Sequence, residues 1–406
     1  MLTADILTMD MHSVHGANKV TEKLIQGREI FEENGIHLRY VVSQDGIIDC
    51  WNYKKSTLGQ GLESTNYKIR RMIIESLKRL PIYKSYFIQK KLVEKLYNGN
   101  EKVVKYYVGA QESNGIVIHQ RADVVIFQDP FTAQYYLEKT LDYNKSIFIS
   151  HAAEDPLEQL LLSRQSLLNT EYEKILRNKF HFMAEHVNKI VTICKTAQKY
   201  NKEVYNLDCP CVMNGIEDVE YIPVPKLSKT DGKIHIAIVA SVQYRKGQDL
   251  AIEALSRLNS EERNRIFLDI MGNGNKFQEY KTKVEQLGLS NNVKFYGAVL
   301  DIENKLPQVD VFLLPSRADT VPIAILEALR AGLPVFATNV GEIPEMISEC
   351  GELIETNVNS IETLYKNLIN NYYDLLLLGQ KSREKFVKEY QLSQMIQKYA
   401  DILSSL

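Results

Sequence analysis

Apolar and polar positions follow two different rhythms along the second half of the chain. Short, nearly continuous apolar runs alternate with longer stretches whose apolar residues fall at helical spacing. The runs predict strands at 234–240, 266–271, 293–296, 309–314 and 334–338, and the stretches predict helices near 248–258, 276–287, 322–331 and 343–348. Continuous apolar strands separated by helices indicate a parallel sheet covered on both faces.

The first half repeats this pattern more loosely. Strands are predicted at 5–11, 37–43, 103–108, 124–128, 146–150 and 189–194. His15, Gly16 and Ala17 follow the first strand and precede a helix over about 19–34, an order that presents backbone N–H groups to an anion. A tight turn that only needs glycine would have the same sequence. Residues 201–232 are rich in turn formers, so the domain boundary is placed near 212–216.

Length and composition are those of a globular protein with two domains. The chain has 406 residues, of which 45% are apolar and 25% charged. A net charge of −2 gives no reason to expect nucleic acid as a partner. The five cysteines lack Cys-x-x-Cys spacing, so we expect reduced thiols in a cytoplasmic protein. The sequence predicts neither a signal peptide nor a membrane span.

The charge is unevenly distributed along the chain. Residues 54–102 contain twelve Lys or Arg and four Glu, with apolar and aromatic residues at helical spacing among them. Basic amphipathic helices of this kind suit an anionic membrane surface, here the inner face of the membrane, or a polyanionic acceptor. A pair of solvated helices packed on the first domain is the alternative.

Loops at the expected carboxyl ends of strands carry the candidate chemistry. Arg245 and Lys246 follow the strand at 234–240, where open α/β sheets bind ligands. Two cations at that place suit a diphosphate that gains charge as it leaves. Asn273 lies between two glycines after the strand at 266–271, and Gly274 with its partner permits close approach of the backbone to a ligand.

Two further loops complete this set. Asp319 follows the strand at 309–314 and precedes a helix that carries Glu327. Carboxylates in such a cleft accept hydrogen bonds from vicinal sugar hydroxyls, and N–H groups at the helix start face an anion. The last loop, 341–345, is another turn that opens a helix, and both a ligand-binding and a purely structural role remain open for it.

In order and spacing, these motifs resemble glycosyltransferase family four, which has the GT-B fold. The resemblance is carried by 212–217, Arg245-Lys246-Gly247, Gly272-Asn273-Gly274, 292–297, 310–316, Asp319 with Glu327, 331–335 and 341–345. It implies an α/β protein with two facing Rossmann-like domains and a deep cleft between them. Residues 1–210 would form the acceptor domain and 211–385 the donor domain, while 386–406 would pack back on the first domain as a helix.

The resemblance also implies roles for single residues. Asp319, Lys246 and Arg245 would be catalytic, with the cations on the diphosphate and the carboxylate on the donor sugar. Glu327 would bind the ribose hydroxyls. The other donor contacts would be Gly16, Ala17, Asn273, Gly274, Tyr296, Thr320, Val321, Pro322 and Ile323. The acceptor side would include Gln128, Asp129, His151 and His15.

The activity implied is that of a retaining glycosyltransferase of the hexosyl or N-acetylhexosaminyl type. A nucleotide sugar, with UDP-sugar favoured, would be the co-substrate, and no metal or other cofactor would be required. The acceptor would be a glycan, a lipid-linked glycan or a protein in cell-surface polysaccharide or glycoconjugate synthesis. Ser241 and Gln128 depart from the residues common in the family, so a non-catalytic GT-B subunit stays open, as does a nucleotide-sugar 2-epimerase.

Overall fold

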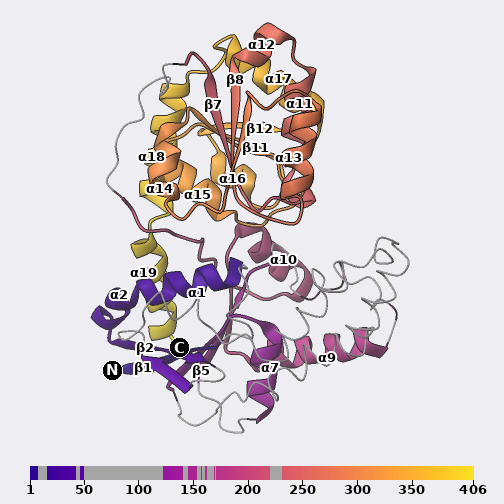
Figure 1. The fold of residues 1–406 in the computed structure, drawn as a ribbon. Coiled ribbons are helices and arrows are strands. Elements are labelled where there is room, and N and C mark those ends of the chain that lie inside the picture. Colours follow the sequence, from indigo (N-terminus) through magenta and orange to yellow (C-terminus); the bar gives the residue numbers. More distant parts are fainter. Residues whose placement is uncertain are drawn as a thin grey trace. The chain divides into compact units, whose positions relative to one another are not determined.

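The computed structural model describes residues 1–7, 16–42, 46–49, 122–139, 145–152, 157, 161, 169, 171–219 and 231–406. They form two compact units. In Figure 1 the first is coloured indigo to magenta except for its yellow C-terminal segment, and the second is coloured from rose through orange to yellow. The first unit comprises Met1–Thr192, Ala197–Cys211 and Ile396–Leu406, and the second comprises Ile193–Thr196 and Val212–Met395. The basic stretch 54–102, the strand predicted at 103–108 and His15 lie outside the described residues.

The first unit is built on a six-stranded sheet. Its strands are β1 (Leu2–Leu7), β2 (Ile36–Val42), β3 (Gly46–Asp49), β4 (Val124–Phe127), β5 (Lys145–Ser150) and β6 (Lys189–Thr192). Their order in space is β3-β2-β1-β4-β5-β6, and all pairs are parallel except β2 with β3. This is the strand order of a Rossmann sheet. Successive strands are added on one side of β1 as far as β3 and on its other side from β4 onward. The sequence pattern missed the antiparallel edge strand β3.

Helices accompany this sheet. They are α1 (Gly16–Gln26), α2 (Arg28–Glu33), α7 (Pro130–Lys139), α9 (Glu171–His186) and α10 (Lys195–Tyr205). The single helix predicted over 19–34 is thus two helices, divided at Gly27. A Cβ atom on Gly27 would lie 2.3 Å from a side-chain carbon of Ile396, so the C-terminal segment packs closely at this break.

The second unit repeats the same strand order in a fully parallel sheet. Its strands are β7 (Ile234–Val239), β8 (Ile266–Met271), β9 (Val293–Gly297), β10 (Val311–Leu314), β11 (Val335–Thr338) and β12 (Gly351–Ile354). They lie in the order β12-β11-β10-β7-β8-β9. All strands predicted in the second half are confirmed within a few residues. The pattern missed β12, an edge strand of which only Ile354 is buried.

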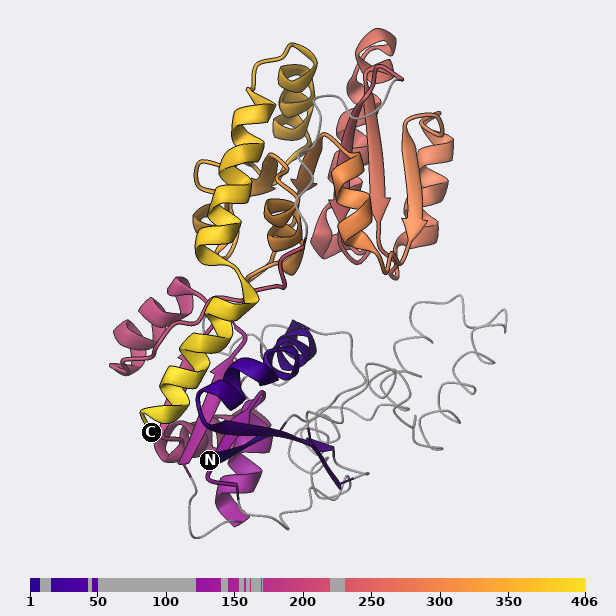
Figure 2. The same ribbon diagram turned by 90° about the vertical axis from the view of Figure 1, so that its left-hand side faces the viewer.

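Helices lie on both faces of the second sheet, as Figures 1 and 2 show. They include α11 (Gln248–Arg257), α12 (Ser260–Asn264), α13 (Phe277–Gln286), α14 (Ile302–Lys305), α15 (Ile323–Arg330), α16 (Ile343–Ile347), α17 (Val358–Ile369) and α18 (Leu375–Glu389), with short 3₁₀ turns η4 (Tyr244–Lys246) and η5 (Leu306–Gln308). The last helix, α19 (Leu392–Ser404), belongs mostly to the first unit. On one face α11 contacts α17, and on the other α15 contacts α18. Because α18 packs on α15, residues 386–395 stay with the second unit, and the part that joins the first unit begins at Ile396 instead of 386.

Candidate active site

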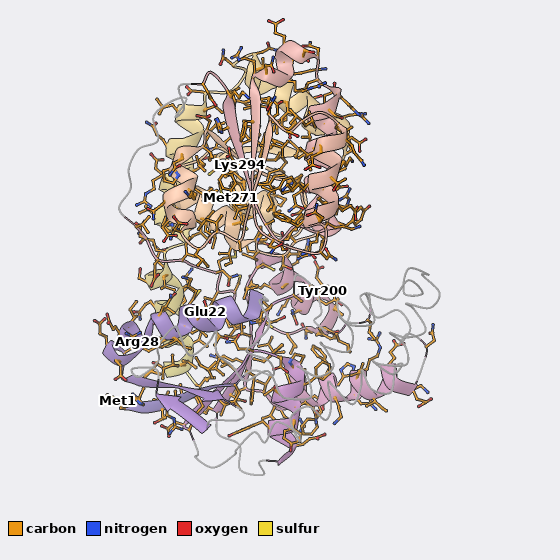
Figure 3. All side chains as sticks on the ribbon, in the orientation of Figure 1. Met1, Glu22, Arg28, Tyr200, Met271 and Lys294 are labelled. Carbon is orange, nitrogen blue, oxygen red and sulfur yellow. The ribbon has the colours of Figure 1, made fainter. Side chains whose placement is uncertain are left out.

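The loops that leave the carboxyl ends of β7, β8 and β10 are joined by backbone hydrogen bonds. The N–H of Val242 donates to the carbonyl of Asn273 (3.0 Å), and the N–H of Arg317 donates to the carbonyl of Arg245 (2.7 Å). Figure 3 labels Met271, the last residue of β8, after which the second of these loops begins, and Lys294 on the neighbouring strand β9. The candidate residues therefore lie in connected loops along one edge of the sheet, the edge formed by the carboxyl ends of the strands, where open α/β sheets bind ligands.

The glycines of these loops approach protein backbone. A Cβ atom on Gly272 would lie 1.9 Å from the carbonyl oxygen of Ala240, and one on Gly274 would lie 2.2 Å from that of Val242. From the sequence, these glycines were predicted to let a ligand approach the backbone closely. Their tight contacts are instead with the neighbouring loop, which they allow to pack backbone against backbone.

Lys246 and Asp319 form an ion pair at this edge. The ammonium of Lys246 contacts Asp319 Oδ2, and both side chains are largely buried, with 12% and 11% of their surfaces exposed. The hydroxyl of Ser316 donates to the same carboxylate at 3.3 Å. The spacing in the sequence placed these two residues 73 positions apart on separate loops, and the fold brings them into contact.

Arg245 adds a second cation beside the pair. Its guanidinium donates to the carbonyl of Ala318 (2.9 Å) and lies 3.8 Å from Asp319 Oδ1. The Arg245 side chain is 49% exposed. Two cations facing one carboxylate leave a local excess of positive charge, which an anionic ligand complements.

The start of α15 borders this group. Its N-terminal capping residue is Pro322, which provides no side-chain hydrogen bond to the first turn. Val321 is buried, Thr320 is half-buried, and Ile323 is the first residue of the helix. Glu327 stands half-buried one turn further on. The predicted phosphate and sugar contacts thus lie on one connection with Asp319, although Pro322 has no N–H to donate.

The residues expected to border the nucleotide base have partners within the protein. The side-chain oxygen of Asn273 accepts from the N–H of Gly274 at 2.8 Å. The hydroxyl of Tyr296 donates to Asp269 at 2.6 Å, and burial and Asp269 raise the pKa of that hydroxyl. Tyr296 therefore belongs to a buried polar network in addition to any role at a ligand.

His235 is the centre of that network. Its Nδ1 lies 2.8 Å from Asp269 and its Nε2 lies 3.1 Å from Asp231. Hydrogen bonds and the charge of Lys233 and His235 lower the pKa of Asp231 in spite of its partial burial. Each ring nitrogen of His235 thus faces a carboxylate oxygen, and the buried ring is held between two acids. The sequence pattern did not reveal this arrangement.

Two of the first-unit predictions concern the start of α1. The pattern placed Gly16 and Ala17 in a loop before a helix from about 19, but both are the first residues of α1. Their backbone amides therefore belong to a helix N-terminus, where the positive end of the helix dipole lies.

Gln128 and His151 meet at the carboxyl ends of β4 and β5. His151 Nε2 lies 2.6 Å from Gln128 Oε1, and because an amide oxygen only accepts, Nε2 carries the proton. Burial lowers the pKa of His151 to about 4, so the ring is neutral at neutral pH. Its Nδ1 is then a buried lone pair that has no hydrogen-bond partner among the described residues, and the same holds for Gln128 Nε2.

Asp129 has a structural function in the described residues. Its carboxylate accepts from the backbone N–H (2.7 Å) and the hydroxyl (2.6 Å) of Thr132. These contacts cap the N-terminus of α7, which begins with Pro130. Capping of α7 is thus an alternative to the predicted role of Asp129 at an acceptor.

The turn at 341–345 holds a distant piece of chain. The side chain of Glu342 accepts from the N–H groups of Lys195 (2.9 Å) and Thr196 (3.2 Å) and from the Thr196 hydroxyl (2.7 Å). Lys195 also pairs with Glu345. Glu342 thereby caps the first turn of α10, which explains why 193–196 belong to the second unit.

No group of three or more His, Cys, Asp or Glu in the described part of the chain is arranged to hold a metal ion. Among the helices of the described ranges, none has the length and apolar character that a transmembrane span needs.

Comparisons with known proteins agree with this architecture. Residues 224–392 match the family described as glycosyl transferases group 1. The O-antigen biosynthesis glycosyltransferase WclY of Escherichia coli is 25% identical over 225 residues, which cover 54% of this chain and 62% of WclY. The lipopolysaccharide glucosyltransferase WaaG of Escherichia coli K12 is 34% identical over 112 residues, which cover 27% of this chain and 30% of WaaG. The chain thus matches less than two thirds of these relatives' lengths.

The overall fold has solved counterparts. The crystal structure of Anabaena HepE in complex with UDP superposes with a TM-score of 0.66 at 14% identity, and each chain is covered completely. The two Rossmann sheets, the group 1 match over the second unit and this structural likeness lead to one assignment. Residues 224–392 thus carry the similarity to the group 1 glycosyl transferases, and the chain as a whole has the GT-B fold.

Proposed function

We propose that this protein transfers a sugar from a UDP-sugar to a hydroxyl group of a glycan, a lipid-linked glycan or a protein, with retention of the anomeric configuration. The observation that carries the proposal is the cluster of Lys246, Arg245 and Asp319 at the carboxyl edge of a parallel sheet. The relatives named for O-antigen and lipopolysaccharide synthesis support a role in making cell-surface polysaccharide or glycoconjugates.

The donor diphosphate binds to the two cations in this proposal. Its oxygens compete with Asp319 for the ammonium of Lys246, and the exposed guanidinium of Arg245 supplies the second charge. When the bond between the sugar and the diphosphate breaks, the leaving group gains charge, and these cations stabilise it. Because two side chains provide this charge, the reaction requires no metal ion.

The released carboxylate of Asp319 then accepts hydrogen bonds from hydroxyls of the donor sugar, and Glu327 accepts those of the ribose. The acceptor hydroxyl attacks the anomeric carbon on the face that the leaving group vacates, and its proton passes to a leaving diphosphate oxygen. This path forms one glycosidic bond and breaks one, and it retains the configuration without a covalent sugar–protein intermediate.

Acceptor contacts are proposed for the first unit. The lone pair on His151 Nδ1 accepts a hydrogen bond from a sugar hydroxyl, and the free N–H of Gln128 donates one. Both groups are uncharged, which suits neutral hydroxyls better than an anionic group.

The basic stretch 54–102 is the proposed contact with an anionic membrane surface, and flotation with liposomes that contain or lack anionic lipid tests it.

Nucleotide binding is the first test. We expect UDP to raise the melting temperature, whereas uridine at the same concentration leaves it unchanged because it lacks the diphosphate. The measurement is repeated with GDP, ADP and dTDP, and in EDTA to test the independence from metals. Failure of every nucleoside diphosphate to bind at millimolar concentration would refute the proposal.

Product analysis then separates the alternatives. Incubation with a UDP-sugar panel and candidate acceptors gives a new glycoside if the protein is a transferase. A changed sugar on the nucleotide without acceptor identifies an epimerase, and nucleotide binding without turnover of any donor identifies a non-catalytic subunit.

The buried neutral His151 predicts sensitivity to acid. Its pKa of about 4 lies below the value of about 6.5 expected in the unfolded chain, so the unfolded state binds more protons between these pH values. Stability therefore falls as the pH is lowered from 6.5 to 4, by up to about 3 kcal/mol from this residue. Urea unfolding at pH 7 and pH 5 should give a smaller loss for His151→Asn than for the wild type.

A control uses a histidine that is exposed in α9. His181→Asn should leave the acid sensitivity of the wild type unchanged. If His151→Asn and the wild type lose the same free energy of unfolding between the two pH values, the assignment of a buried neutral ring is wrong.

A further inference from the structure

Arg317 makes a set of contacts that the proposed chemistry does not use. Its guanidinium donates to both oxygens of Asp249, at 2.8 and 2.7 Å, in a bidentate ion pair. The same group donates to the carbonyl of Tyr244 at 2.6 Å, and its central carbon lies 3.8 Å from the centre of the Tyr244 ring. The side chains of Arg317 and Asp249 are 21% and 19% exposed, so the pair is largely shielded from water.

These contacts surround the two candidate phosphate-binding cations. Tyr244 directly precedes Arg245 and Lys246 in the turn η4, and Asp249 lies in the first turn of α11, which follows. The backbone N–H of Arg317 also donates to the carbonyl of Arg245 at 2.7 Å. Arg317 therefore contacts Tyr244 before the two cations, the backbone of Arg245 itself, and Asp249 after them.

Tyr280 on α13 lies near this carboxylate. Burial together with the charge of Asp249 raises the pKa of Tyr280 to about 12, so the Tyr280 hydroxyl stays protonated at neutral pH. The Arg317–Asp249 pair itself joins the connections that follow β7 and β10.

A turn of this kind needs outside support. The 3₁₀ turn η4 has only three residues, of which Tyr244 and Arg245 are exposed, Tyr244 to 61%. A short 3₁₀ segment has few internal hydrogen bonds to define its geometry. A planar guanidinium that pairs in bidentate fashion and stacks on a ring fixes both distance and orientation.

We propose that Arg317, with Asp249 and Tyr244, is the positioning assembly that sets Lys246 and Arg245 against Asp319. Arg317 and Asp319 belong to the same short loop, so the assembly ties the loop of the acid to the turn of the cations. Arg317 acts through Lys246 and does not touch the donor. The inference rests on the proposed function, in which these cations bind a diphosphate.

Substitution of Arg317 tests the proposal with UDP as the ligand. Arg317→Lys keeps the charge but loses the bidentate geometry and the planar stack, and we expect the Kd for UDP to rise roughly tenfold. Arg317→Ala removes all contacts, and a rise of roughly a hundredfold is expected because small displacements of a positioned group have large effects. Tyr244→Leu removes only the stack at an exposed position and should raise the Kd about threefold.

Arg257→Lys is the matched control. Arg257 also pairs with a glutamate of α11 and with Asn359, but it lies at the far end of that helix and is largely exposed. Its substitution should leave the Kd for UDP unchanged. All Kd values are measured where circular dichroism indicates that each variant is folded.

A double-mutant cycle distinguishes positioning from a general structural role. If Arg317 acts through Lys246, Arg317→Lys should have little further effect in a Lys246→Ala background. Additive effects, or Kd values of Arg317→Lys and Arg317→Ala within twofold of the wild type, would overturn the positioning proposal alone. If the wild type binds no nucleoside diphosphate, the proposed function fails and the positioning proposal fails with it.

Discussion

Lys246→Ala is expected to lower kcat/KM for a nucleotide-sugar donor by roughly 10²–10³-fold, because in the proposed function it removes a charge that stabilises the leaving diphosphate. In the structure this ammonium is largely buried and contacts Asp319. The loss should appear in kcat as well as in KM, since the diphosphate is more negative in the transition state than in the bound donor.

A second substitution controls for the loss of the ion pair itself. Lys246→Ala leaves the Asp319 carboxylate without its strongest partner, which alone disturbs the loop. Asp319→Asn removes the same ion pair but keeps the ammonium, so it should retain UDP binding while turnover falls. Wild-type turnover by Lys246→Ala, measured by release of UDP from the donor, would exclude the proposed role of Lys246.

Gly247→Ala is expected to destabilise the second unit by roughly 3–4 kcal/mol. Gly247 has φ of 71°, and a Cβ atom there would lie 1.9 Å from the carbonyl oxygen of Pro315. The left-handed backbone alone costs a non-glycine residue about 1–2 kcal/mol, and the overlap forces two loop backbones apart. The Pro315 carbonyl belongs to a rigid chain segment and cannot rotate away as a side chain could.

Gly288→Ala isolates the backbone contribution. Gly288 has nearly the same φ, 67°, but its Cβ atom would meet nothing within 4 Å. Urea unfolding should therefore give a loss of about 1 kcal/mol for Gly288→Ala. Equal losses for the two variants would show that close packing of the 245–247 turn against Pro315 contributes nothing. Because Lys246 directly precedes Gly247, Gly247→Ala should also weaken UDP binding.

The local pattern was sufficient for most of the second unit. Nearly continuous apolar runs such as 266–271 are typical of strands covered on both faces, and the observed β8 has those bounds. The helix before Gly332 also follows from local chemistry, because glycine adopts the left-handed conformation that ends a helix, here with φ of 69°. The edge strands were not predicted by this pattern. In β12 only Ile354 is buried, and β3 has only four residues, which begin with a glycine and end with an aspartate. Neither strand has the continuous apolar run of a central strand.

Motif order in the sequence indicated the family and the residues Lys246, Arg245, Asp319 and Glu327. It did not indicate what holds them. Arg317 and Asp249 are 68 positions apart, and Glu342 and Lys195 are 147 apart, so no spacing rule connects them. The same applies to His235, whose two acids come from a preceding turn and a neighbouring strand.

The difference between what the sequence predicted and what only the structure revealed has a physical reason. Strand and helix formation, helix ends and glycine turns depend on residues within a few positions, so the sequence by itself determined the α/β pattern, the domain boundary near Val212 and the positions of the loops that carry the candidate residues. Ion pairs, stacks and buried polar networks depend on which loops the parallel sheet brings together at its edge. Only the tertiary structure decided that Lys246 contacts Asp319, that Arg317 supports their turn, and that glycines next to the site touch protein backbone.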